Sequence, residues 1–266
     1  MFLKKEIGGV PFYAPFEDLP GIRAAISTRE GGVSEGYLAS LNLRVSCGDT
    51  EENVAENLRR FGKAVGFSPE KTVTTRQEHT DTVRHCTLRD AGTGISMPPF
   101  SEGVDGLISD TPQLALLTYY ADCVPVLFCD PVRRAVGICH SGWRGTVSKI
   151  AAKTVQKMEE VFSSRPEDIR AAIGPHIGAC CFEVDAPVYE AFYEAFPGEN
   201  GFAREKGEKY HIDLSAAVKK ALSEVGVREI SDAGICTACH SDEFFSHRKT
   251  GGKRGCFGAM IMITED

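Results

Sequence analysis

Length, composition and charge define the broad class of this 266-residue chain. A hydrophobic fraction of 42% and a charged fraction of 25% are ordinary for a globular protein, and the length allows a sizeable buried core. The formal net charge of −7 argues against a protein built mainly to bind nucleic acid, although it leaves room for a local anion pocket.

The sequence contains no segment typical of membrane insertion or export. No apolar stretch approaches the roughly 20 residues that a spanning helix needs. The start, MFLKKE, has no apolar region behind its lysines, so we expect a cytoplasmic protein without a membrane partner. In that reducing compartment, the ten cysteines are expected to be free, buried or metal-bound instead of paired.

Apolar periodicity predicts three helices in chain order. The first begins with a capping-box pattern at residues 49–52, from Asp to Glu, and ends at Gly66. The second covers residues 146–162, with apolar side chains on one face and Lys and Glu on the other. The third covers residues 214–225, with Gly226 as the expected C-cap.

Five short apolar runs predict strands at residues 114–120, 124–128, 135–139, 169–173 and 259–263. Strands dominate the middle of the chain and helices are interspersed, which indicates an α/β or α+β class. Periodicity does not choose between a parallel and a mixed sheet. Since no repeat, low-complexity tract or linker is present, we expect one domain over residues 1–266.

Histidine spacing excludes several metal-binding signatures. No two of the seven histidines are separated by one residue, whereas a multicopper laccase needs several His-x-His pairs. The chain also lacks HExxH and lacks His-x-Glu followed by Pro-Cys-x-x-Cys, so zinc proteases and zinc-dependent cytidine deaminases are excluded. Any metal site must therefore combine distant segments.

Four cysteines attract attention without completing a known motif. Cys236 and Cys239 lie in CTACH, which matches the haem-attachment pattern, but neither an export signal nor an axial partner is evident. A zinc ribbon needs a second Cys-x-x-Cys, and Cys180 and Cys181 are adjacent. We expect these four side chains to be buried, reduced thiols near a turn.

Three other segments combine turn residues with a metal-binding side chain. They are RQEHTD with His79, ADCVPV with Cys123, and CHSGWRGT with His140 between a strand and a helix. Two imidazoles and one thiolate suit Zn²⁺, with copper as the competitor, and three protein ligands leave one position for water or substrate. By spacing alone, each His could equally be structural and Cys123 a small buried hydrophobe.

At these segments the sequence resembles the polyphenol oxidase or laccase-domain family, also called the YfiH/YlmD family. The matching pieces occur in the family's order over nearly the whole chain: STREGGVS with SLNL, QEH, ADCVPV, HSGWRGT, IGPHIG with CCFEV, CT, and FSHRK. The chain departs from the usual pattern with QEHT in place of QVHG, Ser141 in place of Ala, and His247 in place of Tyr. These departures leave substrate preference open.

The resemblance implies a YfiH-like fold of layered mixed sheets flanked by helices, and a zinc ion, or copper, held by His79, Cys123 and His140. It also implies phosphorolysis of adenosine, inosine, guanosine and S-methyl-5′-thioadenosine to free base and the corresponding ribose 1-phosphate. The resemblance further implies an adenosine deaminase activity beside this pentosyltransferase chemistry. Purine nucleosides and inorganic phosphate are thus the expected partners, and copper-dependent phenol oxidation is an older label.

These reactions need further groups. For phosphorolysis, Arg29, Arg144 and Arg248 are candidates to bind phosphate, because a guanidinium group can form paired, charge-assisted hydrogen bonds. For deamination, a metal-activated water needs a carboxylate to move its proton, and Asp122 and Asp81 are the adjacent candidates. The alternative for each is an ordinary surface salt bridge or a capping role.

Three alternative functions remain open at this point. One is a copper-dependent, laccase-like polyphenol oxidase. Another is a cysteine hydrolase in which Cys123 is the nucleophile and His140 or His79 the base. The third is a non-enzymatic binding protein. The sequence also leaves open whether the chain acts as a monomer or a homodimer.

Overall fold

Two six-stranded sheets lie face to face in the computed structural model, which describes residues 2–198 and 201–265. The first sheet has the order β1 (Leu3–Ile7), β2 (Val10–Ala14), β3 (Ile22–Ser27), β15 (Phe257–Ile263), β7 (Ala115–Tyr120), β4 (Thr72–Thr74). The second has the order β14 (Glu229–Asp232), β10 (Arg170–Ile173), β8 (Val124–Asp130), β9 (Ala135–Ser141), β6 (Gly106–Ser109), β5 (Val83–His85).

Both sheets are mixed, which answers the question that periodicity left open. The pairs β4–β7, β5–β6 and β10–β14 are parallel. The central pairs β15–β3, β15–β7 and β8–β9 are antiparallel. All five predicted strands are present, as β7, β8, β9, β10 and β15, with ends that differ by two residues or fewer.

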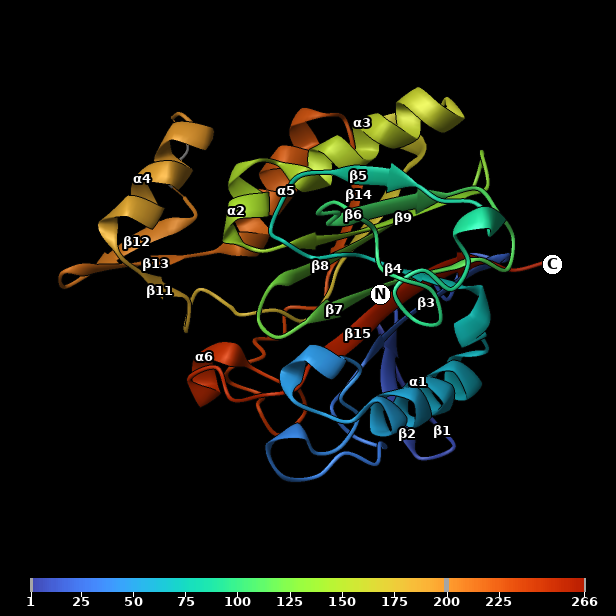
Figure 1. The fold of residues 1–266 in the computed structure, drawn as a ribbon. Helices are drawn as coiled ribbons and strands as arrows, with labels where there is room; N and C mark the ends of the chain where they lie inside the picture. Colours follow the sequence, from blue (N-terminus) through green and yellow to red (C-terminus); the bar gives the residue numbers. More distant parts are fainter. Residues whose placement is uncertain (1, 199–200, 266) are drawn as a thin grey trace.

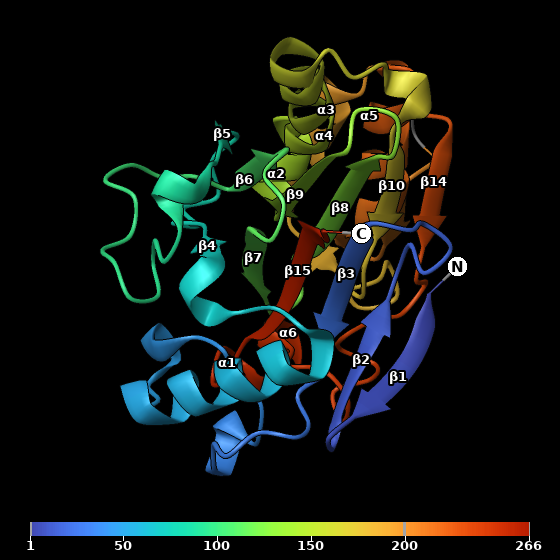
Figure 2. The same cartoon turned by 90° about the vertical axis from the view of Figure 1, so that its right-hand side faces the viewer.

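Helices cover the outer faces of the two sheets. Helix α1 (Glu51–Val65) packs on the first sheet, and α3 (Ile150–Phe162) and α5 (Leu214–Glu224) pack on the second (Figures 1 and 2). A small sheet of β11 (Glu183–Val184), β13 (Lys209–Ile212) and β12 (Ala203–Lys206) projects to the left in Figure 1 with α4 (Ala186–Ala195). The short helices are α2 (Trp143–Val147) and α6 (His247–Thr250). Short 3-10 turns occupy Gly36–Leu38, Val45–Cys47, Pro69–Lys71, Leu88–Asp90 and Pro166–Asp168.

The core has three layers that follow from this stacking. Phe61 of α1 packs with Met260 on the outer face of the first sheet. Tyr120 and Ile138 belong to the layer between the two sheets. Val155 of α3 belongs to the layer between the second sheet and its helices. The expected layered α/β architecture is therefore confirmed.

Three helix boundaries differ from the prediction. Helix α5 ends at Glu224, with Val225 and not Gly226 as its C-cap. Thr50, not Asp49, is the N-cap of α1, because its side chain accepts a hydrogen bond from the Asn53 N–H. The predicted helix over 146–162 is wrong in its first turn, because Lys149 adopts a left-handed conformation (φ 56°) that separates α2 from α3.

No helix in the described part of the chain is long and apolar enough to cross a bilayer.

Candidate metal centre

His79, Cys123 and His140 come from three separate segments and meet at one point. His79 follows β4, Cys123 lies in the turn from β7 to β8, and His140 is near the end of β9. Their ligand atoms all lie within 4.8 Å of one another, and the two imidazole rings are 4.9 Å apart between centroids. His79 is exposed, Cys123 half-buried and His140 buried, so the group opens to solvent on one side.

Strand pairing explains why Cys123 and His140 come together. The β7–β8 turn crosses from the first sheet to the second. Strands β8 and β9 are antiparallel, and Pro125 lies opposite His140. The start of β8 is thus adjacent to the end of β9, which brings the predicted ADCVPV and CHSGWRGT segments together.

Asp105, in the loop just before β6, connects the two histidine segments. Its buried carboxylate has Oδ1 2.7 Å from His140 Nδ1. Oδ2 accepts hydrogen bonds from the backbone N–H groups of Glu78 (3.1 Å) and Thr80 (2.8 Å), on both sides of His79. Because the carboxylate accepts from Nδ1, it leaves Nε2 of His140 as the ligand atom and fixes the ring orientation.

Gly142 provides the space in which the ligands meet. A Cβ atom at this position would lie 2.5 Å from His79 Nδ1 and 3.1 Å from Cys123 Sγ. The backbone therefore passes directly against two of the three ligands, and a larger residue would displace them. Two imidazoles and a thiol in this cradle, with a carboxylate behind one imidazole, fit zinc or copper.

The ionisation of these groups reflects their mutual contacts. Burial alone would lower the pKa of His140, but the charge of Cys123 and the hydrogen bond to Asp105 outweigh it and raise that pKa to about 9. Desolvation and the charge of His140 lower the pKa of His79. Burial opposes ionisation of Asp105, but hydrogen bonds, the one to His140 foremost, keep its pKa below the ordinary value.

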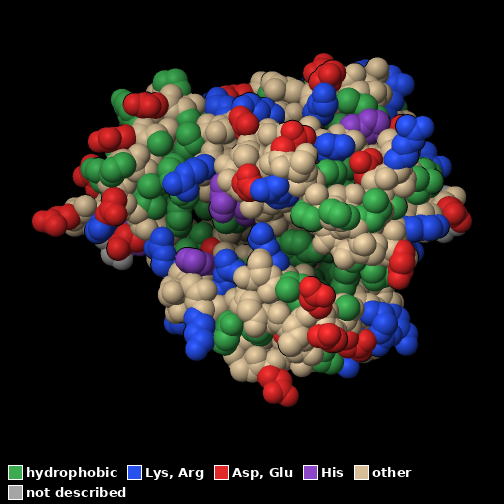
Figure 3. Space-filling view, in the orientation of Figure 1, with side chains coloured by type: hydrophobic (Ala, Val, Ile, Leu, Met, Phe, Trp, Pro, Cys, Tyr) green, Lys and Arg blue, Asp and Glu red, His purple; other side chains and the backbone are tan. Residues whose placement is uncertain are grey.

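A cavity of about 370 Å³ adjoins this group, a size suited to a small molecule. In the space-filling view of Figure 3, which has the orientation of Figure 1, histidine and basic side chains surround a hollow on the face toward the viewer. The lining combines metal-binding, apolar and basic side chains: His79, Ala121, Asp122, Cys123, Trp143, Ile177, Phe182, Leu214, His247, Arg248 and Arg254.

The structure treats the three predicted phosphate-binding arginines differently. Arg248 lines the cavity. Arg144 is exposed on α2 and stacks over Trp143, with its guanidinium carbon 4.3 Å from the ring centroid, and it is not among the residues that line the cavity. Arg29 is not among the residues that line the cavity; its guanidinium donates to the carbonyl groups of Ala39 and Ser241.

Of the two carboxylates predicted to move a proton, Asp122 and Asp81, only one lines the cavity. Asp122 lines the cavity, and its carboxylate accepts from the Thr237 hydroxyl (2.7 Å) and the Arg248 N–H (2.6 Å). Asp81 instead pairs with Lys153 on α3 at the surface and is absent from the cavity lining. Of the two carboxylates, the structure thus places Asp122 beside the metal-binding group.

Sequence reasoning missed several residues of this region. Asp105 stands in Gly-Val-Asp-Gly immediately before an apolar strand, and an acidic residue between glycines at a strand start was an available signal. Arg254 has no comparable local signature.

The expectation that Cys180 and Cys239 are buried is wrong, because both are exposed. Neighbouring loops bring them together with two further cysteines.

The fold and site define a class: stacked mixed sheets that carry a His–Cys–His centre at their junction. The chain belongs to the family described as multi-copper polyphenol oxidoreductase laccase, whose model matches residues 23–264. In the described residues, the groups able to hold a metal are this centre and a cluster of four cysteines, so the structure shows no trinuclear histidine cluster there.

Curated relatives and solved structures agree with this membership. A purine nucleoside phosphorylase of Bacteroides thetaiotaomicron is 37% identical over 94% of this chain and 95% of its own length. The purine nucleoside phosphorylase YlmD of Geobacillus stearothermophilus is 36% identical over 92% of both chains. The crystal structure of YfiH from Bacillus licheniformis superposes with a TM-score of 0.91 at 32% identity, covering 98% of this chain and 99% of that chain.

Proposed function

We propose that the chain is a cytoplasmic purine nucleoside phosphorylase that works as one catalytic domain over residues 1–266. The observation that carries this proposal is the cavity itself, which is lined by His79 and Cys123 of the His–Cys–His group, by apolar side chains and by two arginines. The names of relatives that align over more than nine-tenths of the chain support it. The ten free cysteines support a reducing compartment.

We assign the metal to His79, Cys123 and His140, as zinc with copper as the alternative. When bound by these residues, the ion would supply Lewis-acid chemistry near neutral pH. Asp105 keeps His140 oriented for this role through the 2.7 Å contact at Nδ1. His79 and Cys123 can lie this close to the backbone because residue 142 is a glycine; a Cβ atom there would collide with the His79 ring and press tightly against Cys123 Sγ.

Phosphorolysis breaks the bond between C1′ and the purine nitrogen and forms a bond from C1′ to a phosphate oxygen. The departing base takes up, directly or through side chains of the cavity, the proton that the attacking hydrogen phosphate gives up. In the cavity, the apolar side chains of Trp143 and Phe182 offer surfaces for the base. Arg248 and Arg254 supply positive charge for the phosphate, and the Arg248 guanidinium is held in place by the carbonyl groups of Cys181 and Glu183.

We propose adenosine deamination as a second activity of the same cavity, converting adenosine and water to inosine and ammonia. Asp122 would move the proton that this reaction transfers. Each of its oxygens accepts one hydrogen bond, which leaves further lone pairs for a substrate proton. Adenosine, inosine, guanosine and S-methyl-5′-thioadenosine are the proposed substrates of the phosphorylase.

The test is a panel of these nucleosides assayed with and without phosphate, with base and ribose 1-phosphate measured by chromatography. Base release should require phosphate, and arsenate should replace it because it has a similar shape and charge. Arg248→Ala should weaken phosphate use about 10- to 100-fold, since a charge-assisted contact contributes roughly 1.5–3 kcal/mol. Arg144→Ala should have a smaller effect because Arg144 does not line the cavity but stacks over Trp143, which does.

The matched control is Arg59→Ala, which removes an exposed arginine paired with Glu56 on α1 and should leave both reactions unchanged. Equal losses of phosphorolysis and deamination in Arg248→Ala would mean that Arg248 shapes the cavity and does not bind phosphate. Oxygen uptake on phenols without phosphate-dependent base release would favour the laccase-like oxidase. Phosphate-independent hydrolysis that is blocked by alkylation of Cys123 would favour the cysteine hydrolase.

A further inference from the structure

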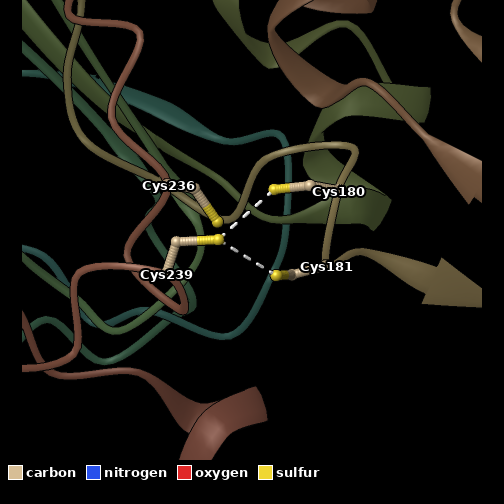
Figure 4. Close-up of side chains that lie close together, drawn as sticks. All are labelled: Cys180, Cys181, Cys236 and Cys239. Carbon is tan, nitrogen blue, oxygen red and sulfur yellow. Dashed lines mark hydrogen bonds between the residues drawn. The ribbon is translucent and has the colours of Figure 1, made fainter.

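Four cysteines outside the proposed catalytic centre meet between two loops. Cys180 and Cys181 lie in the loop from β10 to β11, and Cys236 and Cys239 lie in the loop that follows β14. Their four sulfur atoms all lie within 4.8 Å of one another. Figure 4 shows the side chains from the two loops directed toward one another, with their sulfur atoms at the centre.

The sulfur spacing suits a shared metal ion. The Sγ atom of Cys239 is 3.6 Å from that of Cys180 and 3.5 Å from that of Cys181. Four sulfurs bound tetrahedrally at a Zn–S distance of about 2.3 Å lie about 3.8 Å apart. Cys239 is thus almost equally close to two partners, whereas a disulfide would join it to one.

The backbone around Cys236 favours the thiolate form of this one side chain. Cys236 Sγ accepts a hydrogen bond from the Gly178 N–H at 3.2 Å. Burial opposes ionisation of Cys236, but backbone N–H groups of Gly178 and Cys239 outweigh it and lower the pKa of this thiol. A Cβ atom on Gly178 would lie 3.3 Å from Cys180 Sγ, so a glycine allows the two loops to approach closely.

Without a cation the thiols of Cys180 and Cys181 resist ionisation. Burial and hydrogen bonds with the neighbouring sulfurs raise the pKa of Cys180 to about 11. The same causes raise the pKa of Cys181. A divalent cation compensates the charge of the clustered thiolates, which is the condition under which such ligands lose their protons.

We propose that Cys180, Cys181, Cys236 and Cys239 form a second, structural metal site for a thiophilic divalent cation, in the first place zinc. Binding replaces four S–H bonds with four metal–sulfur bonds and releases four protons to solvent, with no change in oxidation state. A set of four protein ligands leaves no position for substrate, so the role is structural. This site does not depend on the proposed catalytic function.

The position of the cluster indicates what the ion would stabilise. The two loops are joined to each other by the hydrogen bond from the Thr237 N–H to the His176 carbonyl, and to the β7–β8 turn by the bond from the Ile177 N–H to the Asp122 carbonyl. The Cys181 carbonyl accepts from Arg248, which lines the cavity. A metal held by both loops would therefore fix the side of the cavity that faces the His–Cys–His group.

Metal content of the purified full-length protein tests the proposal. Elemental analysis after purification without added metal should give about two metal ions per chain. Cys239→Ser should lose one and keep the other, and Cys123→Ser should lose the other. Cys47→Ser is the matched control, because Cys47 is a half-buried cysteine outside both clusters, and this variant should keep two ions.

Two further measurements keep the test independent of whether a serine variant folds. In the cobalt-substituted protein, the sulfur-to-cobalt charge-transfer absorption should come mostly from the four-cysteine site, so Cys236→His should reduce it while retaining metal. In the wild-type protein, peptide mass spectrometry should show these four cysteines protected from alkylation until a chelator removes the metal. One metal per chain with all four thiols alkylated in the native protein would overturn the proposal. A disulfide between the two loops in anaerobically purified protein would overturn it as well.

Discussion

The substitution Asp105→Asn tests whether a single buried carboxylate positions both histidine ligands. Asp105 is 0% exposed. Its Oδ1 contacts His140, and its Oδ2 accepts from Glu78 and from both the N–H and the hydroxyl of Thr80. An asparagine has the same shape but presents one oxygen and one NH2 group, so it cannot accept on both sides.

Either orientation of the amide damages the site. If the NH2 group of the asparagine faces His140, then Nδ1 of His140 must accept a hydrogen bond from it. The ring proton then moves to Nε2, and Nε2 can no longer bind the metal. If the NH2 group faces residues 78–80, buried N–H donors oppose it and the His79 loop loses its acceptor. An unsatisfied buried donor costs about 1–3 kcal/mol. Loss of a partner behind a metal-bound histidine reduces affinity about 10- to 100-fold.

We therefore expect metal affinity to fall about 10- to 100-fold, and the free energy of unfolding of the metal-free protein to fall by about 2 kcal/mol. The assays are a competition titration against a coloured chelator and urea denaturation. The control is Asp81→Asn, which removes a carboxylate that pairs with Lys153 at the surface and should change neither value appreciably. An affinity of Asp105→Asn within threefold of the wild type would refute the proposed positioning role.

Three further predictions follow from individual contacts. Gly142→Ala should cost roughly 100-fold in activity, because its Cβ would lie 2.5 Å from His79 Nδ1, and a folded variant with unchanged kcat would contradict this. Thr50→Ala should lower the free energy of unfolding by about 1 kcal/mol through loss of the cap on Asn53, as urea denaturation can measure; no change would mean that Asp49 provides the cap. In the metal-free protein the pKa of His140 should be about 9, above its ordinary 6.5, so its contribution to stability is complete below pH 6.5 and disappears as pH rises through 9. An NMR titration of the imidazole checks this, and a midpoint near 6.5 would rule it out.

Local signals predict much of the fold. The five strands are predictable because apolar runs in a buried sheet are bounded by turns, and α1 and α5 because their apolar spacing matches one helix face. The break at Lys149 escapes prediction because its left-handed backbone depends on the packing of α2, while the apolar spacing continues across it. Tertiary context there overrides a regular pattern.

The site residues that can be predicted from the sequence are those that stand in a recognisable short segment, and contacts between distant segments cannot be predicted in this way. His79, Cys123 and His140 each stand in a segment that resembles the family, and the structure brings the three together. Asp105 contacts His140 across 35 positions of sequence, and the cysteine loops meet across more than 50, so neither arrangement leaves a spacing pattern to read. Arg29 shows that a local signal can also mislead. It lies in a glycine-rich segment that suggests phosphate binding, but its guanidinium donates to the backbone carbonyl groups of Ala39 and Ser241.

The residues in and around the cavity lie partly on strands and partly on loops. This difference determines where in the chain substitutions can change substrate preference. Cys123 and His140 belong to the strands and the inter-sheet turn, so the sheet register fixes their relative placement. Ile177 and Phe182 come from a loop, and Arg254 follows a short helix. Loops tolerate substitution and insertion far better than central strands do. For the proposed phosphorylase, mutations that alter nucleoside preference can thus accumulate on the loop side, while the chemistry supplied by the strands remains the same.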